Sequence, residues 1–302
     1  MQYSHGIVAA IGAYLFWGIL PIYWKALKSV SAMEIFCHRM VWSLFFTWLL
    51  ILISRRLGSL ASLCRDRKNL LLVGAASLFL ACNWLLYIWA VNAGYVIETS
   101  LGYYINPLVS VLFGVLFLGE RLRPGQIGAL LVALGGVLYL TYYYGQFPWI
   151  AFSLAFCFGS YGLLHKKMTM PVLEELFVET AILFLPTALF LVVREAGGHG
   201  AFLHGSHWQT VLLIGTGLIT SLPLLFFAYA AQRISLIHLG LLQYIAPTMN
   251  LLLGIFLYHE PFPRERMVGF MLVWSALVIY MAEGVLVRKR RVLAEKRALT
   301  DG

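Results

Sequence analysis

Ten long apolar segments, separated by short polar ones, make up almost the whole chain. An α-helix rises 1.5 Å per residue, so about 20 apolar residues cross a hydrocarbon core of about 30 Å. Lipid offers the backbone no hydrogen-bond partners, and segments that are continuously apolar rather than alternating favour helices over a barrel. We therefore predict an all-α integral membrane protein with ten transmembrane helices. Their expected bounds are 7–26, 33–53, 70–92, 97–119, 125–143, 147–164, 173–193, 209–229, 238–258 and 267–287.

The composition agrees with a membrane protein and argues against other classes. Hydrophobic residues make up 61% and charged residues 12%, whereas soluble domains have about 45–50% and about 25%. The net charge of +9 does not indicate a nucleic-acid partner, because the basic residues lie in short loops and in the tail. The cysteines Cys37, Cys64, Cys82 and Cys157 share no close spacing. We therefore expect no metal, no cofactor and no disulfide framework.

The distribution of Lys and Arg predicts the orientation in the membrane. Basic residues accumulate in the short cytoplasmic loops of membrane proteins. With the N-terminus in the cytoplasm, sixteen Lys and Arg residues fall inside, five fall outside and Arg39 lies within a span. We therefore predict that both termini are cytoplasmic, and that the basic tail, residues 291–302, is attracted to anionic lipid.

The two halves of the chain repeat each other with an offset of 140–141 residues. Glu34 matches Glu175, and three residues of the fourth span recur in the ninth: Tyr104, Pro107 and Gly114 match Tyr244, Pro247 and Gly254. We divide the chain into repeats at 1–145 and 146–290. Because each repeat has five spans, an odd number, the second must enter the membrane from the opposite side. Inverted repeats of this kind recur in transporters, with the substrate near the bilayer midplane between them.

Three segments carry a resemblance to a known family. They are WGILPIYWK at 17–25, EIFCHRMVWS at 34–43 and SLGYYINPL at 100–108. The chain resembles the drug/metabolite transporter superfamily with paired EamA domains, and within it the RarD family, often labelled chloramphenicol-sensitive or chloramphenicol-resistance permeases. The resemblance covers nearly the whole chain. It implies ten helices, a plasma-membrane (inner-membrane) location and permeation or export of small metabolites or drug-like solutes, without a settled substrate.

Three neighbouring ionisable residues near the start of the second span are candidates for substrate binding or gating. An ionisable group within a span costs roughly 2.5–3.5 kcal/mol on insertion scales and usually faces a cavity or a partner. Glu34 and His38 share a helix face, and Arg39 follows. Glu34 also fits a capping box with Ser31, so a purely capping role is the alternative for it. His38 could support proton coupling, because its reference pKa is about 6.5.

The remaining candidates are aromatic and amide side chains at membrane depth. Aromatic rings could stack against an aromatic or amphipathic solute, and amides could bind it, although packing and interhelical hydrogen bonds are alternatives for each one. Matched prolines should kink the fourth and ninth spans. The binding candidates are Trp17, Asn83, Trp84, Tyr103, Asn106, Gln243 and Tyr244, and the kink candidates are Pro107 and Pro247.

The leading functional hypothesis is a secondary transporter that alternates access between its repeats. The chain has no Gly-x-x-x-x-Gly-Lys-Ser/Thr motif, so it has no P-loop of its own for ATP hydrolysis. An intramembrane enzyme is an alternative, but the His-Glu-x-x-His and Gly-x-Ser-x-Gly motifs are missing, and we expect no enzyme activity. A channel-like protein is a second alternative, because inverted repeats occur in channels too.

Overall fold

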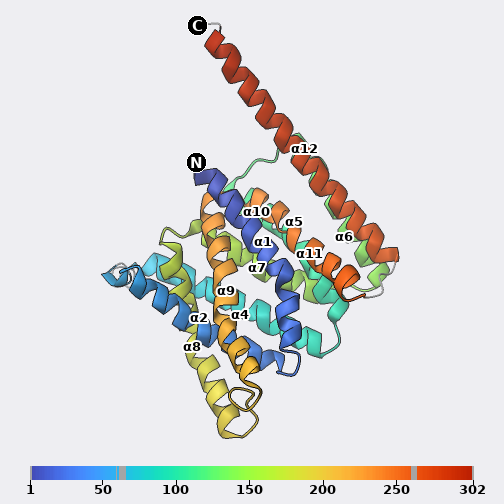
Figure 1. Cartoon of the computed structure of the whole chain (residues 1–302). Helices are drawn as coiled ribbons and strands as arrows, with labels where there is room; N and C mark the ends of the chain where they lie inside the picture. Colours follow the sequence, from blue (N-terminus) through green and yellow to red (C-terminus); the bar gives the residue numbers. More distant parts are fainter. Residues whose placement is uncertain (1, 59, 61–65, 260–263, 301–302) are drawn as a thin grey trace.

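The computed structural model describes residues 2–58, 60, 66–259 and 264–300, and in this part of the chain it is helical and contains no strand. Figure 1 shows the helices in one bundle, with α12 extending beyond it. This architecture confirms the all-α prediction. The helices are α1 Gln2–Ala26, α2 Ala32–Ile53, α4 Arg67–Asn92, α5 Val96–Leu118, α6 Pro124–Tyr144, α7 Trp149–Lys167, α8 Val172–Ala196, α9 His207–Arg233, α10 Leu236–Leu242, α11 Ile245–Leu252, the π-helix η1 Leu253–Leu257, and α12 Arg264–Thr300.

Each of the ten expected spans falls on helical structure. Nine helical stretches of the described chain are long and apolar enough to cross a membrane, one of which joins α10, α11 and η1. The remaining expected span, the sixth, corresponds to α7, which is less apolar because its last turn carries His165, Lys166 and Lys167. It is nevertheless an inner helix, since it packs against α4, α5 and α9. The count of ten therefore agrees with the architecture.

The helix contacts recur when the two halves are exchanged. Helix α1 packs on α9 as α7 packs on α4, and α1 packs on α11 as α7 packs on α5. Three further contacts join an element to its own counterpart: α2 to α8, α5 to α10, and α6 to α12. Such a pattern is what an approximate two-fold relation between the halves produces.

The two matched prolines have different consequences. Helix α5 continues through Pro107, whereas the ninth span is interrupted four residues before Pro247, between α10 and α11. Proline has no N–H for the carbonyl four residues earlier. That carbonyl, from Gln243, instead accepts from the backbone N–H of Ala246 at 3.3 Å. The predicted irregularity is therefore clear in the second half, at the centre of the bundle.

The helix that contains the tenth span continues into the basic tail. The tenth span was expected at 267–287, but α12 runs to Thr300. Residues 285–300 contain neither proline nor glycine and are rich in Leu, Ala, Glu, Lys and Arg, which are strong helix formers. Within the bundle α12 packs mainly on α6.

Candidate functional site

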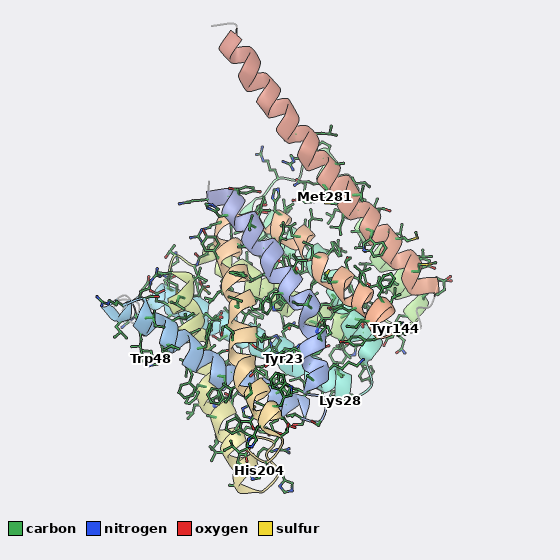
Figure 2. All side chains as sticks on the ribbon, in the orientation of Figure 1. Tyr23, Lys28, Trp48, Tyr144, His204 and Met281 are labelled. Atoms are coloured by element: carbon green, nitrogen blue, oxygen red, sulfur yellow. The ribbon has the colours of Figure 1, made fainter. Side chains whose placement is uncertain are left out.

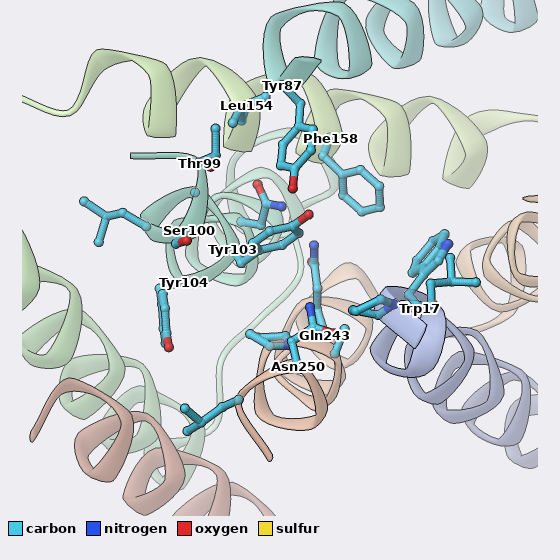
Figure 3. A pocket seen from close by; sticks show the side chains of 18 of the residues that line it. Trp17, Tyr87, Thr99, Ser100, Tyr103, Tyr104, Leu154, Phe158, Gln243 and Asn250 are labelled. Carbon is cyan, nitrogen blue, oxygen red and sulfur yellow. The ribbon is translucent and has the colours of Figure 1, made fainter. Parts of the chain in front are cut away.

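A cavity of about 990 Å³ lies between the two halves. Residues from both halves line it, and Figure 3 shows a subset of them around the open space. At one end the lining reaches Trp24 near the end of α1, Tyr144 at the end of α6 and Tyr258 after η1. These three helix ends share one side of the membrane in the predicted topology, and that side is the outer one. The cavity thus extends from the middle of the bundle to this end, which we call the mouth.

Arg39 is the only Lys, Arg, Asp or Glu among the described residues that line the cavity. Its Nε donates a hydrogen bond to Thr220 Oγ1 at 3.0 Å. Its guanidinium carbon lies 4.1 Å from the Trp84 ring centroid and 5.1 Å from that of Trp24. Cation–π contacts of this kind contribute about 0.5–2 kcal/mol and hold the cation in place. The bond to Thr220 uses Nε and does not involve the two terminal nitrogens of the guanidinium. Because these two nitrogens can bind a carboxylate in bidentate fashion, Arg39 is suited to hold an anionic group.

Three asparagines of the cavity lining differ in their pairing: Asn83 bonds to the backbone, whereas Asn106 and Asn250 each keep an unpaired oxygen. Asn83 donates from Nδ2 to the Leu154 carbonyl at 2.8 Å, which is an interhelical hydrogen bond between α4 and α7. Asn106 and Asn250 line the cavity, and their Oδ1 atoms are buried with no hydrogen-bond partner in the described structure. Unpaired buried acceptors are unfavourable, so a bound donor group would stabilise them.

Aromatic side chains form much of the wall. Trp17 contacts Phe158, with ring centroids 5.8 Å apart, and Tyr87 contacts Tyr103 at 6.4 Å. All four line the cavity, as do Trp84 and Gln243. Figure 3 shows Trp17, Tyr103 and Gln243 around the space. A ring-lined cavity of this kind accommodates an apolar or aromatic body.

Glu34 lies outside the cavity and holds a connecting segment instead. Its Oε1 accepts from the backbone N–H of Ala201, and its Oε2 is 3.5 Å from Arg194 Nη2. Its own backbone N–H donates to Ser31 Oγ at 3.3 Å, as a capped helix start requires. The side chain therefore ties the start of α2 to the segment after α8.

His38 also lies away from the lining. Its Nδ1 accepts from Trp42 Nε1 at 3.3 Å, and its ring lies 5.2 Å from that of Phe202. Of the three neighbouring ionisable candidates, the structure therefore brings only Arg39 into the cavity. A role for His38 in transport stays a prediction.

The candidate residues in the matched fourth and ninth spans also differ in whether they line the cavity. Pro247 lines the cavity, whereas Pro107 and Tyr244 do not. Tyr244 is fully buried, and its hydroxyl donates to the backbone carbonyl of Tyr104, which is a lining residue. Pro107 lies behind the wall, where its carbonyl oxygen faces Gly240 of α10. Both therefore position the wall rather than form it.

A second group of ionisable residues, not predicted from the sequence, lies at the end of the bundle opposite the mouth. It contains His165, Glu175 and Glu179, all buried. The offset of 141 residues relates Glu175 to Glu34 and Glu179 to His38, so the repeat itself carried the signal. In the part of the chain that the structure describes, no three or more His, Cys, Asp or Glu residues are arranged to hold a metal ion.

Comparison with known proteins identifies the family. The model of the EamA-like transporter family matches residues 4–142 and 148–282. The chain belongs to this family. It is 47% identical to Protein RarD of Streptomyces exfoliatus, over 91% of this chain and 87% of that protein. It is 41% identical to the uncharacterized transporter YojE of Bacillus subtilis (strain 168), over 91% and 93%.

The family and its relatives agree with the resemblance carried by the three segments. Several relatives that are 37–47% identical over most of the chain are named RarD, which places this EamA-like protein in the RarD family of the drug/metabolite transporter superfamily. A solved crystal structure of a protein with 19% identity superposes with a TM-score of 0.71 and covers 95% of this chain and 98% of that one. At that identity the likeness concerns the fold alone. The chain is thus a multi-pass membrane transporter.

Proposed function

We propose that the cavity is the substrate site of a secondary transporter for small solutes that combine an anionic or carbonyl group with an aromatic or apolar body. The observation that carries the proposal is the position of Arg39 as the single charged side chain of the described lining, fixed by Thr220 and by the Trp84 ring. A desolvated guanidinium attracts a carboxylate or carbonyl oxygen strongly. The rings around it favour an apolar body.

The unpaired amide oxygens refine this substrate class. Asn106 and Asn250 each present a buried Oδ1 in the wall. A solute that carries an N–H or O–H group as well as its anionic group would satisfy both the guanidinium and an amide oxygen. We therefore expect amphipathic carboxylates with a donor group to bind better than simple hydrocarbons of equal size.

The route of transport is alternating access between two inverted repeats, 1–145 and 146–290. The exchange of helix contacts between the halves supports such a relation. Both repeats contribute to the wall, as expected for a site between them. The orientation, with cytoplasmic termini in the plasma membrane, rests on the basic residues of the loops.

Flux in proteoliposomes tests the proposal. A panel of radiolabelled aromatic carboxylates, their neutral amides and their amines, measured with and without a pH gradient, should show saturable flux selective for the carboxylates. Arg39→Gln should abolish that selectivity and lower flux at least tenfold. Thr220→Val, which leaves the guanidinium in place but removes its Nε partner, should have a smaller effect. Lys28→Gln, at an exposed position, is the charge-matched control.

Two outcomes would contradict the proposal. Wild-type flux and selectivity in the Arg39→Gln variant would remove the guanidinium from the binding site. Flux that rises linearly with concentration, without saturation, would favour the channel-like alternative over a carrier.

A further inference from the structure

His165, Glu175 and Glu179 form a buried ionisable cluster on the far side of the bundle from the cavity mouth. Their side chains are 1%, 0% and 1% exposed. Imidazole Nδ1 contacts Glu175 Oε1, and imidazole Nε2 lies 3.2 Å from Glu179 Oε1. Both ring nitrogens therefore face a carboxylate oxygen.

The number of protons in this cluster follows from its contacts. A close approach of a ring nitrogen to a carboxylate oxygen needs a proton between the two atoms, so two contacts require two protons. Whichever atoms hold these two protons, the imidazole and the two carboxylates together carry a net charge of −1. The two remaining carboxylate oxygens also accept: Glu179 Oε2 from Tyr161 Oη at 3.2 Å, and Glu175 Oε2 from Gln232 Nε2 at 2.9 Å. Each carboxylate oxygen of Glu175 and Glu179 thus faces a donor or an imidazole nitrogen, but one negative charge stays buried.

No cation in the described part of the chain balances this charge. Among the described residues, the ion pairs of Glu175 and Glu179 involve only His165. The other charged or titratable groups on the surrounding elements have partners elsewhere or lie exposed. Arg56 after α2 pairs with Glu174 of α8, and His238 of α10 contacts Ser235. Lys166 of α7 donates to the Ile234 carbonyl, and Arg233 of α9 donates to the Tyr229 carbonyl. Arg67 and Lys68, at the start of α4, are exposed. An uncompensated buried charge is costly, and proton uptake removes it.

The cluster also joins three helices beneath a layer of aromatic rings. His165 is on α7, both glutamates are on α8, and Gln232 is on α9. Above them the Phe227 ring packs on Trp17 and Tyr161, each with centroids 5.7 Å apart. Trp17 lines the cavity, and Tyr161 contacts the imidazole at 4.1 Å. The aromatic layer and the cluster together close the end of the bundle opposite the mouth.

We propose that His165, Glu175 and Glu179 form a proton-binding site that fastens α7, α8 and α9 together at this end, and that a third proton releases the fastening. The proton is taken from water and bonds to a carboxylate oxygen. That oxygen then carries an O–H group and accepts much less strongly than a charged carboxylate oxygen, so its hydrogen bond to the present donor weakens. The link from this release to solute exit rests on the proposed function; the binding of the proton does not.

Infrared difference spectroscopy of the purified protein tests proton binding without any solute. A pH titration in detergent should show the C=O stretching band of a carboxylic acid that forms on acidification. Glu175→Gln or Glu179→Gln should remove it. His165→Gln should shift its midpoint upward, since the imidazole no longer stabilises the carboxylates. Glu34→Gln is the matched control, because Glu34 is the repeat counterpart of Glu175, and it should retain the band.

Two further measurements separate the parts of the proposal. Tyr161→Phe removes one donor to Glu179 and should raise the midpoint even if the glutamine variants do not fold. Hydrogen–deuterium exchange of residues 160–180, corrected for intrinsic rates, should increase when the wild type is protonated and be high at every pH in Glu179→Gln.

An unaltered carboxylic acid band in both glutamine variants and in Tyr161→Phe overturns the proton site. A titrating band without increased exchange overturns the fastening. A titrating band in a protein that transports no solute overturns the proposed function alone.

Discussion

The hydroxyl of Tyr244 donates a hydrogen bond to the backbone carbonyl of Tyr104 at 3.1 Å, and the two residues occupy the same position in the two repeats. Tyr244 is fully buried, whereas Tyr104 lines the cavity. The bond joins the break between α10 and α11 to the continuous helix α5. Figure 3 shows Tyr104 at the edge of the cavity. The cavity wall is therefore fixed from behind, across the boundary between the halves.

Tyr244→Phe tests the strength of this link. The substitution keeps the ring and removes one buried hydrogen bond, so it should lower the free energy of unfolding by about 0.5–1.5 kcal/mol. The measurement is thermal or denaturant unfolding of the purified protein in detergent. Tyr142→Phe is the control, because Tyr142 is 80% exposed. Equal stability of the two variants would show that the Tyr104 bond contributes nothing.

Gly217→Ala should separate α2 from α9. A Cβ at Gly217 would lie 2.4 Å from the backbone carbonyl carbon of Trp42, which cannot move aside as a flexible side chain would. Overpacking of this kind typically costs 1–3 kcal/mol. The control is Gly128→Ala in α6, where a Cβ would meet nothing within 4 Å. It should be neutral or stabilising by up to about 1 kcal/mol, because alanine favours helix. A stable Gly217→Ala protein would contradict the close packing of these helices.

The fold was predictable because hydrophobic segment length and helix propensity are local properties. All ten spans lie on helices, and Ser31 caps the start of α2 as expected. The unexpected features are those that local patterns do not decide. The helix is interrupted before Pro247 but continues through Pro107, although the two prolines occupy matched positions in the repeats. The difference depends on which neighbours the surrounding helices supply.

The site was predictable only in part. The position of a polar residue within a span indicates that its burial is costly, but it does not say toward which neighbour the side chain points. Arg39 and His38 are adjacent in sequence, and helical geometry sends their side chains to different faces. The first reaches the cavity and the second contacts Trp42 and Phe202. Asn250 and Tyr87 line the cavity too, yet nothing in the sequence distinguished them from interhelical or interfacial residues. The partners of a helix face are a tertiary property.

Glu34→Gln should loosen the segment 197–206 without changing the cavity. The carboxylate accepts from the Ala201 N–H and pairs with Arg194, and neither contact involves a lining residue. Because the Arg194 side chain is 37% exposed, the ion pair itself should contribute little, about 0–1 kcal/mol. Hydrogen–deuterium exchange should therefore increase in 197–206 while solute flux stays near wild type. Arg39→Gln should show the reverse behaviour: flux lost and exchange in 197–206 unchanged. Loss of flux in Glu34→Gln would instead assign it a gating role.

The side of the membrane on which the C-terminus lies decides which side the mouth faces. Sixteen Lys and Arg residues lie on the side assigned to the cytoplasm and five on the other, so a reporter fused after Gly302 should be active only in the cytoplasm. The cavity reaches Trp24 and Tyr258 at the opposite side, and it should therefore open outward in this conformation. A single cysteine at Tyr258 should react with a membrane-impermeant maleimide added to intact cells, and one at Lys167 should react only after the cells are opened. A cytoplasmic reporter with an unreactive Tyr258→Cys would show a closed mouth. A periplasmic reporter would reverse the topology and, with it, the side on which the His165 cluster takes up its proton.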